Sequence, residues 1–162
     1  LADHHEHAVT VPDMTELTVE VLNAGLEARI PRAHQMGIRF AELRPGYVRA
    51  EVPVEGNGNH FGVIYAGVTF TLAEVLGGAL HYATFDVSTH YPLVRGLNIE
   101  FLAPGRGRLS ASAMLSEPEI ERVRAAAPAG KVPFELVAEV VGEDGTLVAR
   151  TRGDYQIRPY GS

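Results

Sequence analysis

The chain has 162 residues, of which 46% are hydrophobic and 21% charged, a length and composition typical of one folded domain with a single core. Its 14 Lys and Arg against 20 Asp and Glu leave a net charge of -6, which repels phosphate backbones and argues against nucleic acid as a partner. The absence of cysteine excludes disulfides, thiol nucleophiles and thiolate metal sites, and no leader pattern stands in residues 1–12, so a cytoplasmic protein is expected.

The beginning of the chain predicts a helix followed by a hairpin. Asp13 is placed to cap a helix that runs to about residue 28, and Pro31 is expected to end it. Residues 38–44 and 47–54 alternate as strands do. A Pro-Gly pair between them suits the centre of a type II turn.

The middle of the chain predicts a long buried helix. A polar, glycine-rich loop at residues 55–62 leads into a helix over about residues 65–84. Residues 63–80 are apolar enough to suggest a membrane span, but Glu74 near their centre costs about 2.5–3.5 kcal/mol in a bilayer. A helix buried inside a domain is therefore predicted, with no attachment to a membrane.

The rest of the chain predicts sheet with one helical insert. Residues 86–92 are expected to form a loop, after which apolar and polar side chains alternate with the strand period. Ser116 and Pro118 predict the start of a short helix to about Ala127, with Gly130 beyond its end. The expected strands cover residues 97–101, 109–115, 134–140 and 147–157.

These elements predict an α+β fold in which a curved antiparallel sheet wraps around one central helix. Residues 1–28 are expected to form an N-terminal tail and helix, and residues 29–160 the main body of what is a single domain overall.

Three short motifs are weak signals. The glycines of residues 56–62 are spaced one residue too far apart for a dinucleotide-binding turn, and antiparallel strands follow. Asp86, Ser88 and His90 have the residue types of a hydrolytic triad, but alternate residues of one loop diverge. Three histidines within residues 4–7 have no nearby carboxylate helix, so no metal site is predicted.

Chemistry is expected at Glu74, the only charged residue between Tyr65 and Phe85. A solvated helix face is the alternative explanation, but such a face usually carries several charges. Two successive helical glycines next to it predict that another backbone or a ligand comes close. The residues within about 60° of Glu74 on the helix are Gly67, Phe70, Thr71, Gly77, Gly78 and His81.

Residues 59–74 resemble the signature of hot-dog-fold acyl-CoA thioesterases of the PaaI-like branch. In that signature an Asn, a His-Gly-Gly and then an acidic residue open the central helix. Here Asn59 matches the Asn, Tyr65-Ala66-Gly67 stands in place of His-Gly-Gly, and Glu74 takes the acidic position. The surrounding chain, over about residues 28–157, is similar to the YiiD-type thioesterase-like subgroup.

The resemblance implies a hot-dog fold and hydrolysis of an acyl-CoA or a related thioester at a subunit interface of a homodimer or homotetramer. The amide of Ala66 or Gly67 at the helix start would polarise the thioester carbonyl. Glu74 would act as general base or nucleophile, and Asn59 would orient the water or the carboxylate. No metal or cofactor is implied apart from coenzyme A as part of the substrate. Candidates for binding the substrate are Tyr65, Phe61, Phe70, Thr71 and His81.

Three positions depart from the family pattern. Tyr65 and Ala66 replace a His and a Gly, and Val94 stands where a Ser or Thr is common. A non-catalytic module that binds acyl-CoA or lipid is therefore an alternative, whereas a hot-dog dehydratase or hydratase is disfavoured because it needs the His that Tyr65 replaces. Candidate cations for the coenzyme phosphates are Arg95, Arg106, Arg108 and Arg152.

Overall fold

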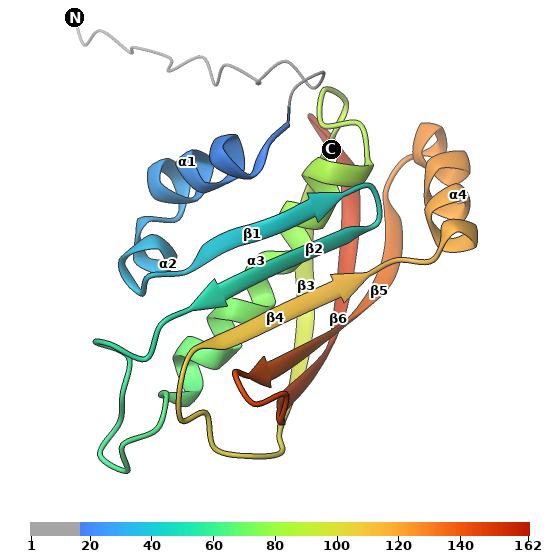
Figure 1. Cartoon of the computed structure of the whole chain (residues 1–162). Coiled ribbons are helices and arrows are strands. Elements are labelled where there is room, and N and C mark those ends of the chain that lie inside the picture. Colours follow the sequence, from blue (N-terminus) through green and yellow to red (C-terminus); the bar gives the residue numbers. More distant parts are fainter. Residues whose placement is uncertain (1–16) are drawn as a thin grey trace, which may run out of the picture.

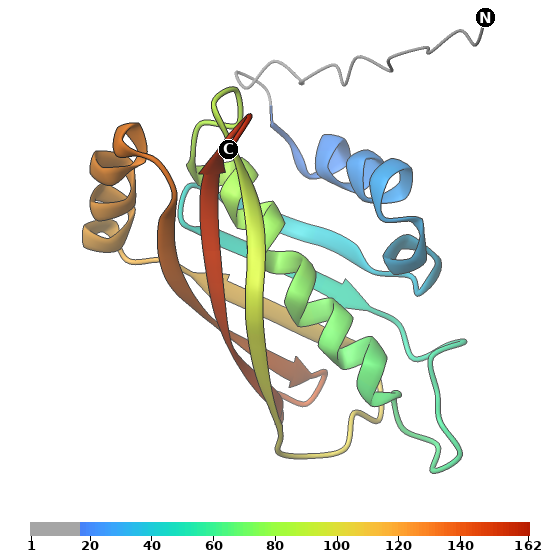
Figure 2. The same cartoon turned by 180° about the vertical axis from the view of Figure 1, so that it is seen from behind.

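The computed structural model describes residues 17–162. Its antiparallel sheet has six strands in the order β1-β2-β4-β5-β6-β3, and the long helix α3 lies in the hollow of this sheet (Figures 1 and 2). The predicted α+β class, with a curved sheet around a central helix, is confirmed. The elements are α1 (Val19–Arg29), α2 (Pro31–Gln35), β1 (Arg39–Arg44), β2 (Tyr47–Val52), α3 (Ala66–Thr84), β3 (His90–Phe101), β4 (Leu109–Met114), α4 (Glu117–Ala126), a 3-10 turn (Ala127–Ala129), β5 (Val132–Gly142) and β6 (Leu147–Pro159).

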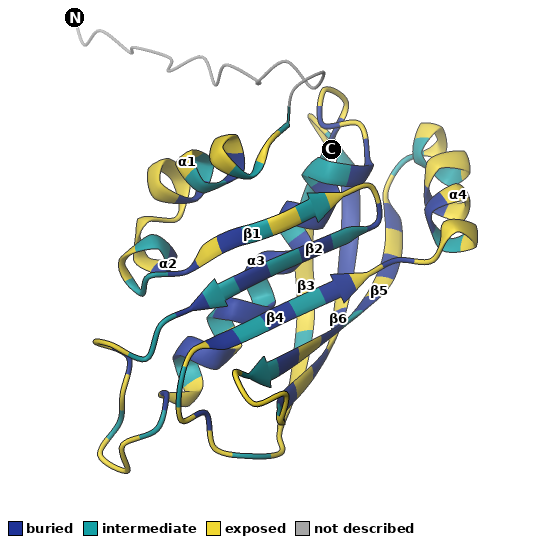
Figure 3. Cartoon of the chain, viewed as in Figure 1, coloured by how far each residue is buried: buried dark blue, intermediate teal, exposed yellow. Residues whose placement is uncertain are grey.

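The core lies between α3 and the concave face of the sheet. The strands β2, β4 and β5 alternate buried and less buried positions, as the two-residue period predicts (Figure 3). On α3, Val68, Leu72, Leu76 and Ala79 are buried against them as expected, whereas Ala83 near the helix end is only half-buried. Burial of these apolar side chains is the main force that holds the helix in the sheet.

The first hairpin forms as predicted. Arg44 pairs with Tyr47 across the turn, and Gly46 has a φ of 78°, the value that the third position of a type II turn requires. The amide of Gly46 donates to the Thr84 hydroxyl at 2.9 Å, which ties this turn to the end of α3.

The first helix begins later than predicted, at Val19, and ends about where predicted, at Arg29. Thr18 caps α1, because its hydroxyl accepts a hydrogen bond from the Val21 amide at 3.2 Å. The predicted cap, Asp13, lies outside the described residues. Pro31 does not simply end the helix: it is the first residue of α2, where a missing N–H costs nothing.

Helix α1 is fastened to the domain rather than set apart from it. It buries Leu22 and Leu26 in the shared core. The Asn23 amide donates to the Phe40 carbonyl at 3.0 Å and accepts from the Phe40 amide at 2.8 Å, as a neighbouring strand would. The predicted boundary between residues 28 and 29 therefore falls inside a helix that packs on the edge strand β1.

Strand β3 begins at His90, although a loop was predicted over residues 86–92 and a strand only from Leu97. The early part of this strand was not predicted because it contains Pro92 and Gly96, and both residue types are uncommon inside strands. Proline is acceptable there because β3 is an edge strand that pairs only with β6, with a bulge between Val94 and Gly96.

The helical insert α4 begins after Ser116, whose hydroxyl accepts from the Glu119 amide at 3.4 Å, and Gly130 follows its 3-10 extension, as predicted. Within residues 17–162, no helix combines the length and apolarity needed to cross a membrane.

Candidate active site

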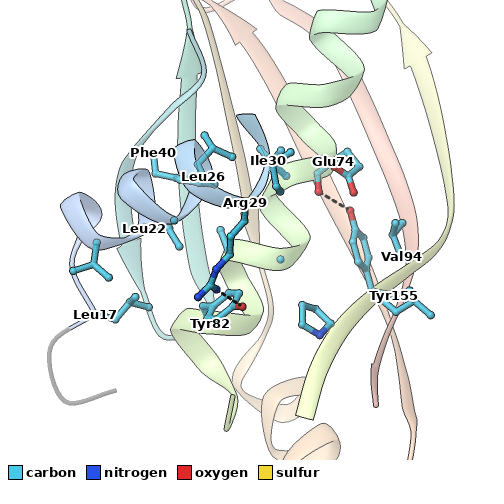
Figure 4. Close-up of a pocket in the computed structure, with 17 residues that line it drawn as sticks. Leu17, Leu22, Leu26, Arg29, Ile30, Phe40, Glu74, Tyr82, Val94 and Tyr155 are labelled. Carbon is cyan, nitrogen blue, oxygen red and sulfur yellow. Dashed lines mark hydrogen bonds between the residues drawn. The ribbon is translucent and has the colours of Figure 1, made fainter. Parts of the chain in front are cut away.

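A cavity of about 460 Å³ opens between α1, α3 and the start of β3. It is apolar except for the side-chain groups of Arg29, Glu74, Tyr82 and Tyr155 (Figure 4). Its size lies within the range of cavities that enclose small-molecule ligands. The apolar wall includes Leu22, Leu26, Phe40, Val75, Ala79 and Val94.

Glu74 is half-buried in this cavity and not on a solvated helix face. Desolvation by the surrounding apolar groups raises the pKa of its carboxyl above the usual value. None of the ion pairs formed by the described residues involves Glu74. An unpaired, partly desolvated carboxylate in a cavity is a strong base for its residue type.

Tyr155 on β6 lines the cavity beside Glu74. Its hydroxyl donates to the backbone carbonyl of Glu74 at 3.3 Å (Figure 4), and its ring stacks on Phe134 with the centroids 5.7 Å apart. Burial, and then the charge of Glu74, raise the pKa of this phenol, so it stays protonated and neutral. Sequence reasoning missed Tyr155, because nothing local shows that residue 155 meets residue 74.

The two successive glycines of α3 meet different surroundings. A Cβ on Gly77 would lie 2.0 Å from Cε1 of Tyr155, so only glycine admits that ring. A Cβ on Gly78 would meet no heavy atom within 4 Å, because this residue faces the cavity. A close approach does occur at Gly77, but the approaching group is the Tyr155 side chain and not the backbone or ligand that the two glycines predicted.

The start of α3 presents free amide groups. The first intrahelical hydrogen bonds run from the amides of Val68 and Thr69 to the Tyr65 carbonyl. Among residues 17–162, no hydrogen bond engages the amides of Ala66 or Gly67, as is usual for a helix start. Both N–H groups can therefore donate to an oxyanion.

Tyr65 and Thr71 both touch Gly67. A Cβ on Gly67 would lie 2.5 Å from Cε1 of Tyr65, so the ring of this exposed tyrosine lies against the helix start. The Thr71 hydroxyl donates to the Gly67 carbonyl at 2.8 Å, a bond within the helix.

Three other predicted site residues, Asn59, Phe61 and Phe70, do not line this cavity of the single chain. The Asn59 side-chain oxygen accepts from the Phe61 amide at 2.9 Å, which shapes its own loop. The Phe61 ring is 76% exposed and contacts His60, and Phe70 is partly exposed on α3.

His81 is in the core, which corrects the expectation that it lines a pocket beside Glu74. It is fully buried, and its Nε2 lies 3.2 Å from the His90 carbonyl oxygen. Burial lowers its pKa to about 4, so the ring is neutral near pH 7. The start of β3 covers this turn of α3, whereas the turn that carries Glu74 stays open.

The weak motifs form no second site. The Ser88 hydroxyl donates to Asp86 at 2.6 Å, but Nε2 of His90 lies against the Ala127 carbonyl, so no triad exists. The described residues contain no cluster of His, Asp and Glu suited to a metal, and the histidines of residues 4–7 lie outside them.

Two of the four candidate phosphate-binding arginines have partners. Arg152 pairs with Glu135, and Arg108 lies 3.7 Å from Glu51. Arg95 and Arg106 take part in none of the ion pairs between described residues.

A curved antiparallel sheet wrapped around one central helix defines a protein of the hot-dog fold, and Glu74 is the one acidic residue on that helix. Residues 7–157 match the family described as "Domain of unknown function (DUF4442)", and the chain belongs to this family. No curated protein matches it.

Solved structures share this fold. PA5026 from Pseudomonas aeruginosa, a protein of unknown function called a probable thioesterase, is 36% identical with a TM-score of 0.82, over 89% of this chain and 97% of that chain. Thioesterase HI1161 from Haemophilus influenzae is 18% identical with a TM-score of 0.73, over 91% and 94% of the two chains. A mutant of thioesterase PA1618 from P. aeruginosa is 24% identical with a TM-score of 0.71, over 88% and 95%.

Proposed function

We propose that this protein is a thioester hydrolase that acts on acyl-CoA or a related acyl thioester. The observation that carries the proposal is the half-buried Glu74, which has a raised pKa and faces a largely apolar cavity. The name of PA5026, a probable thioesterase at 36% identity, supports the same reaction class.

In the proposed reaction, Glu74 takes a proton from a water molecule while the water oxygen attacks the thioester carbonyl carbon. The carbonyl oxygen becomes an oxyanion, which the amide of Ala66 or Gly67 stabilises. When the C–S bond breaks, the thiolate leaves and takes up a proton, and a carboxylic acid and a free thiol result. Direct attack by the Glu74 carboxylate, followed by hydrolysis of the anhydride, is the second route to the same products.

Two copies of the chain are needed to assemble this site. Glu74 lies seven residues beyond Gly67, about 10 Å along the axis of α3. The amides at a helix start point away from the helix body, so a carbonyl bound there lies still farther from the Glu74 of the same chain. A second copy brings its own helix start to Glu74.

The free edge of β3 is the surface proposed for this pairing. The opposite edge, β1, is covered by α1 through Asn23, whereas β3 presents exposed apolar side chains, among them Leu93, Val94 and Phe101. A long edge strand with exposed apolar side chains favours pairing with another strand. Since Leu93 and Val94 also line the cavity, a dimer formed along β3 places the Glu74 site at the subunit interface.

The first test is Glu74→Gln, assayed by release of free thiol from acyl-CoAs. We expect the rate to fall about a hundredfold or more. In the wild type, the acid limb of kcat/KM should lie above the usual carboxyl range, since the pKa of Glu74 is raised. An unchanged rate for Glu74→Gln on a good substrate would refute its role as the base.

Glu74→Gln should also stabilise the protein at neutral pH. A raised carboxyl pKa means that folding favours the protonated form, so this contribution is present below the unfolded pKa and lost as pH rises through the folded pKa. Glutamine resembles the protonated form at every pH. Urea unfolding at pH 7 should show the variant to be more stable than the wild type, and equal or lower stability would contradict the burial argument.

Mixing two inactive variants tests whether the site spans two chains. Ala66→Pro removes one amide proton at the first helical position, where proline is tolerated, and Glu74→Gln removes the base. In a mixed dimer, one site retains an intact Ala66 and an intact Glu74, so activity should return after co-refolding. Mixed dimers that form without regaining activity would refute a shared site.

Binding without turnover is the second candidate function. The Tyr65 ring lies against Gly67, next to the proposed oxyanion donors. Tight acyl-CoA binding with no thiol release by the wild type, and turnover gained by Tyr65→Ala, would establish a binding module.

A further inference from the structure

Resting on the proposed function, we infer that the cavity selects an acyl group about ten carbon atoms long whose far end carries a hydrogen-bond acceptor, with a carboxylate as the best match. The inference names the substrate class of the Glu74 site. It rests on the shape of the groove along α3 and on the polar groups at its end.

The groove runs along one stripe of α3. Glu74, Gly78 and Tyr82 are spaced four residues apart, so they follow one another along the same side of the helix. Gly78 forms an open floor between the two larger side chains, since a Cβ there would meet no heavy atom within 4 Å. Leu26 of α1 and Val94 of β3 also line this cavity.

The length of the groove sets the length of the acyl group. Eight residues separate Glu74 from Tyr82, which is about 12 Å along the helix axis. With carbon–carbon bonds of about 1.5 Å and angles near 111°, an extended chain advances about 1.25 Å per bond. A thioester carbonyl beside Glu74 therefore places the tenth carbon, approximately, at Tyr82.

The end of the groove offers donors and positive charge. Arg29 Nη1 donates to the Tyr82 hydroxyl at 3.1 Å (Figure 4), which leaves the phenol proton and further guanidinium protons to donate elsewhere. Neither side chain takes part in an ion pair between described residues. A carboxylate is the group that fits such donors best, and a hydroxyl fits them in part.

The charges at the two ends orient this substrate. Glu74, when ionised as the base, repels a second carboxylate, and Arg29 attracts it. The remaining lining is almost entirely apolar and suits the methylene chain between them. Because Arg29 is exposed to water, the expected discrimination is moderate, about tenfold in kcat/KM.

The test compares three CoA thioesters of equal length: decanoyl, 10-hydroxydecanoyl and 9-carboxynonanoyl. We expect kcat/KM to rise in that order, with the carboxylated ester about tenfold above decanoyl. In Arg29→Gln this ratio should fall to about one, and Tyr82→Phe should lower it. Arg32→Gln is the matched control. It removes an equal charge from a residue of α2 that does not line the cavity, so the ratio should persist.

The other outcomes separate this inference from the proposed function. Equal rates on all three esters, or a preference for decanoyl, would overturn the selection of a polar end and leave thioester hydrolysis intact. If Arg29→Gln lowers kcat/KM equally for all three, Arg29 binds the coenzyme part and the inference is wrong. If no ester is hydrolysed but the carboxylated one binds about tenfold more tightly than decanoyl, the cavity assignment stands and the hydrolase proposal fails.

Discussion

Gly77 and Gly78 are neighbours in α3, yet the same substitution should change the free energy of unfolding in opposite directions. Gly78→Ala adds a methyl where no heavy atom lies within 4 Å, so the gain in helix propensity should stabilise the protein by about 0.8–1 kcal/mol. Gly77→Ala has the same gain, but its Cβ would lie 2.0 Å from the Tyr155 ring. That ring is held by its stack on Phe134.

Overpacking of this kind costs about 3 kcal/mol at the upper end of its usual range, so Gly77→Ala should lose about 2 kcal/mol overall. The two variants should then differ by about 3 kcal/mol, which is about 6–12 °C in Tm for a domain of this size. Urea unfolding at pH 7 measures the difference directly. Equal stabilities would refute the close approach of Tyr155 to α3, on which the described wall of the Glu74 site depends.

Three further predictions concern the helix start, the core histidine and α1. Ala66→Pro removes one amide proton at the first helical position, after a Tyr65 whose φ of -59° and ψ of 136° already suit a following proline. If this amide holds the oxyanion, kcat should fall about 10²–10³-fold, and an unchanged kcat would rule Ala66 out. His81 should contribute a loss of about 3 kcal/mol of wild-type stability as pH falls from about 6.5 to about 4, because its imidazole takes up a proton in the unfolded chain but stays neutral when buried. His81→Leu should lack this component in urea unfolding at the two pH values, and an unaltered pH dependence would contradict the burial argument. Asn23→Ala removes both hydrogen bonds to Phe40 and should lower the free energy of unfolding by about 1–3 kcal/mol. Relative to the wild type, amide hydrogen exchange should become faster in α1, and this acceleration should be larger than any in α3. Unchanged exchange in α1 would show that other contacts fasten this helix.

Most of the fold could be predicted because its signals are local. The alternation of apolar and polar residues predicts β2, β4 and β5, and the long apolar run predicts α3. The Pro-Gly pair predicts the turn of the first hairpin. The early part of β3 could not be predicted this way. Pro92 and Gly96 usually break strands, and only the position of β3 at the sheet edge, which no local pattern reveals, makes them acceptable.

The residues of the candidate site likewise include some that local sequence patterns could predict and some that they could not. Glu74 was predictable because a single carboxylate in an apolar helix needs an explanation. The free amides of Ala66 and Gly67 were predictable because the first N–H groups of every helix lack a partner within the helix. His81 shows the limit, since it shares the helical face of Glu74 by angle and yet lies fully buried beneath His90.

The amino-acid sequence by itself determined the periods, the turns and the one acidic residue on the central helix, because these depend on neighbours within a few positions. Only the tertiary structure decided that Tyr155 packs against Gly77, that Arg29 meets Tyr82 and that α1 closes the cavity. Those contacts join residues many positions apart, and the order of the strands and the packing of α1 bring them together.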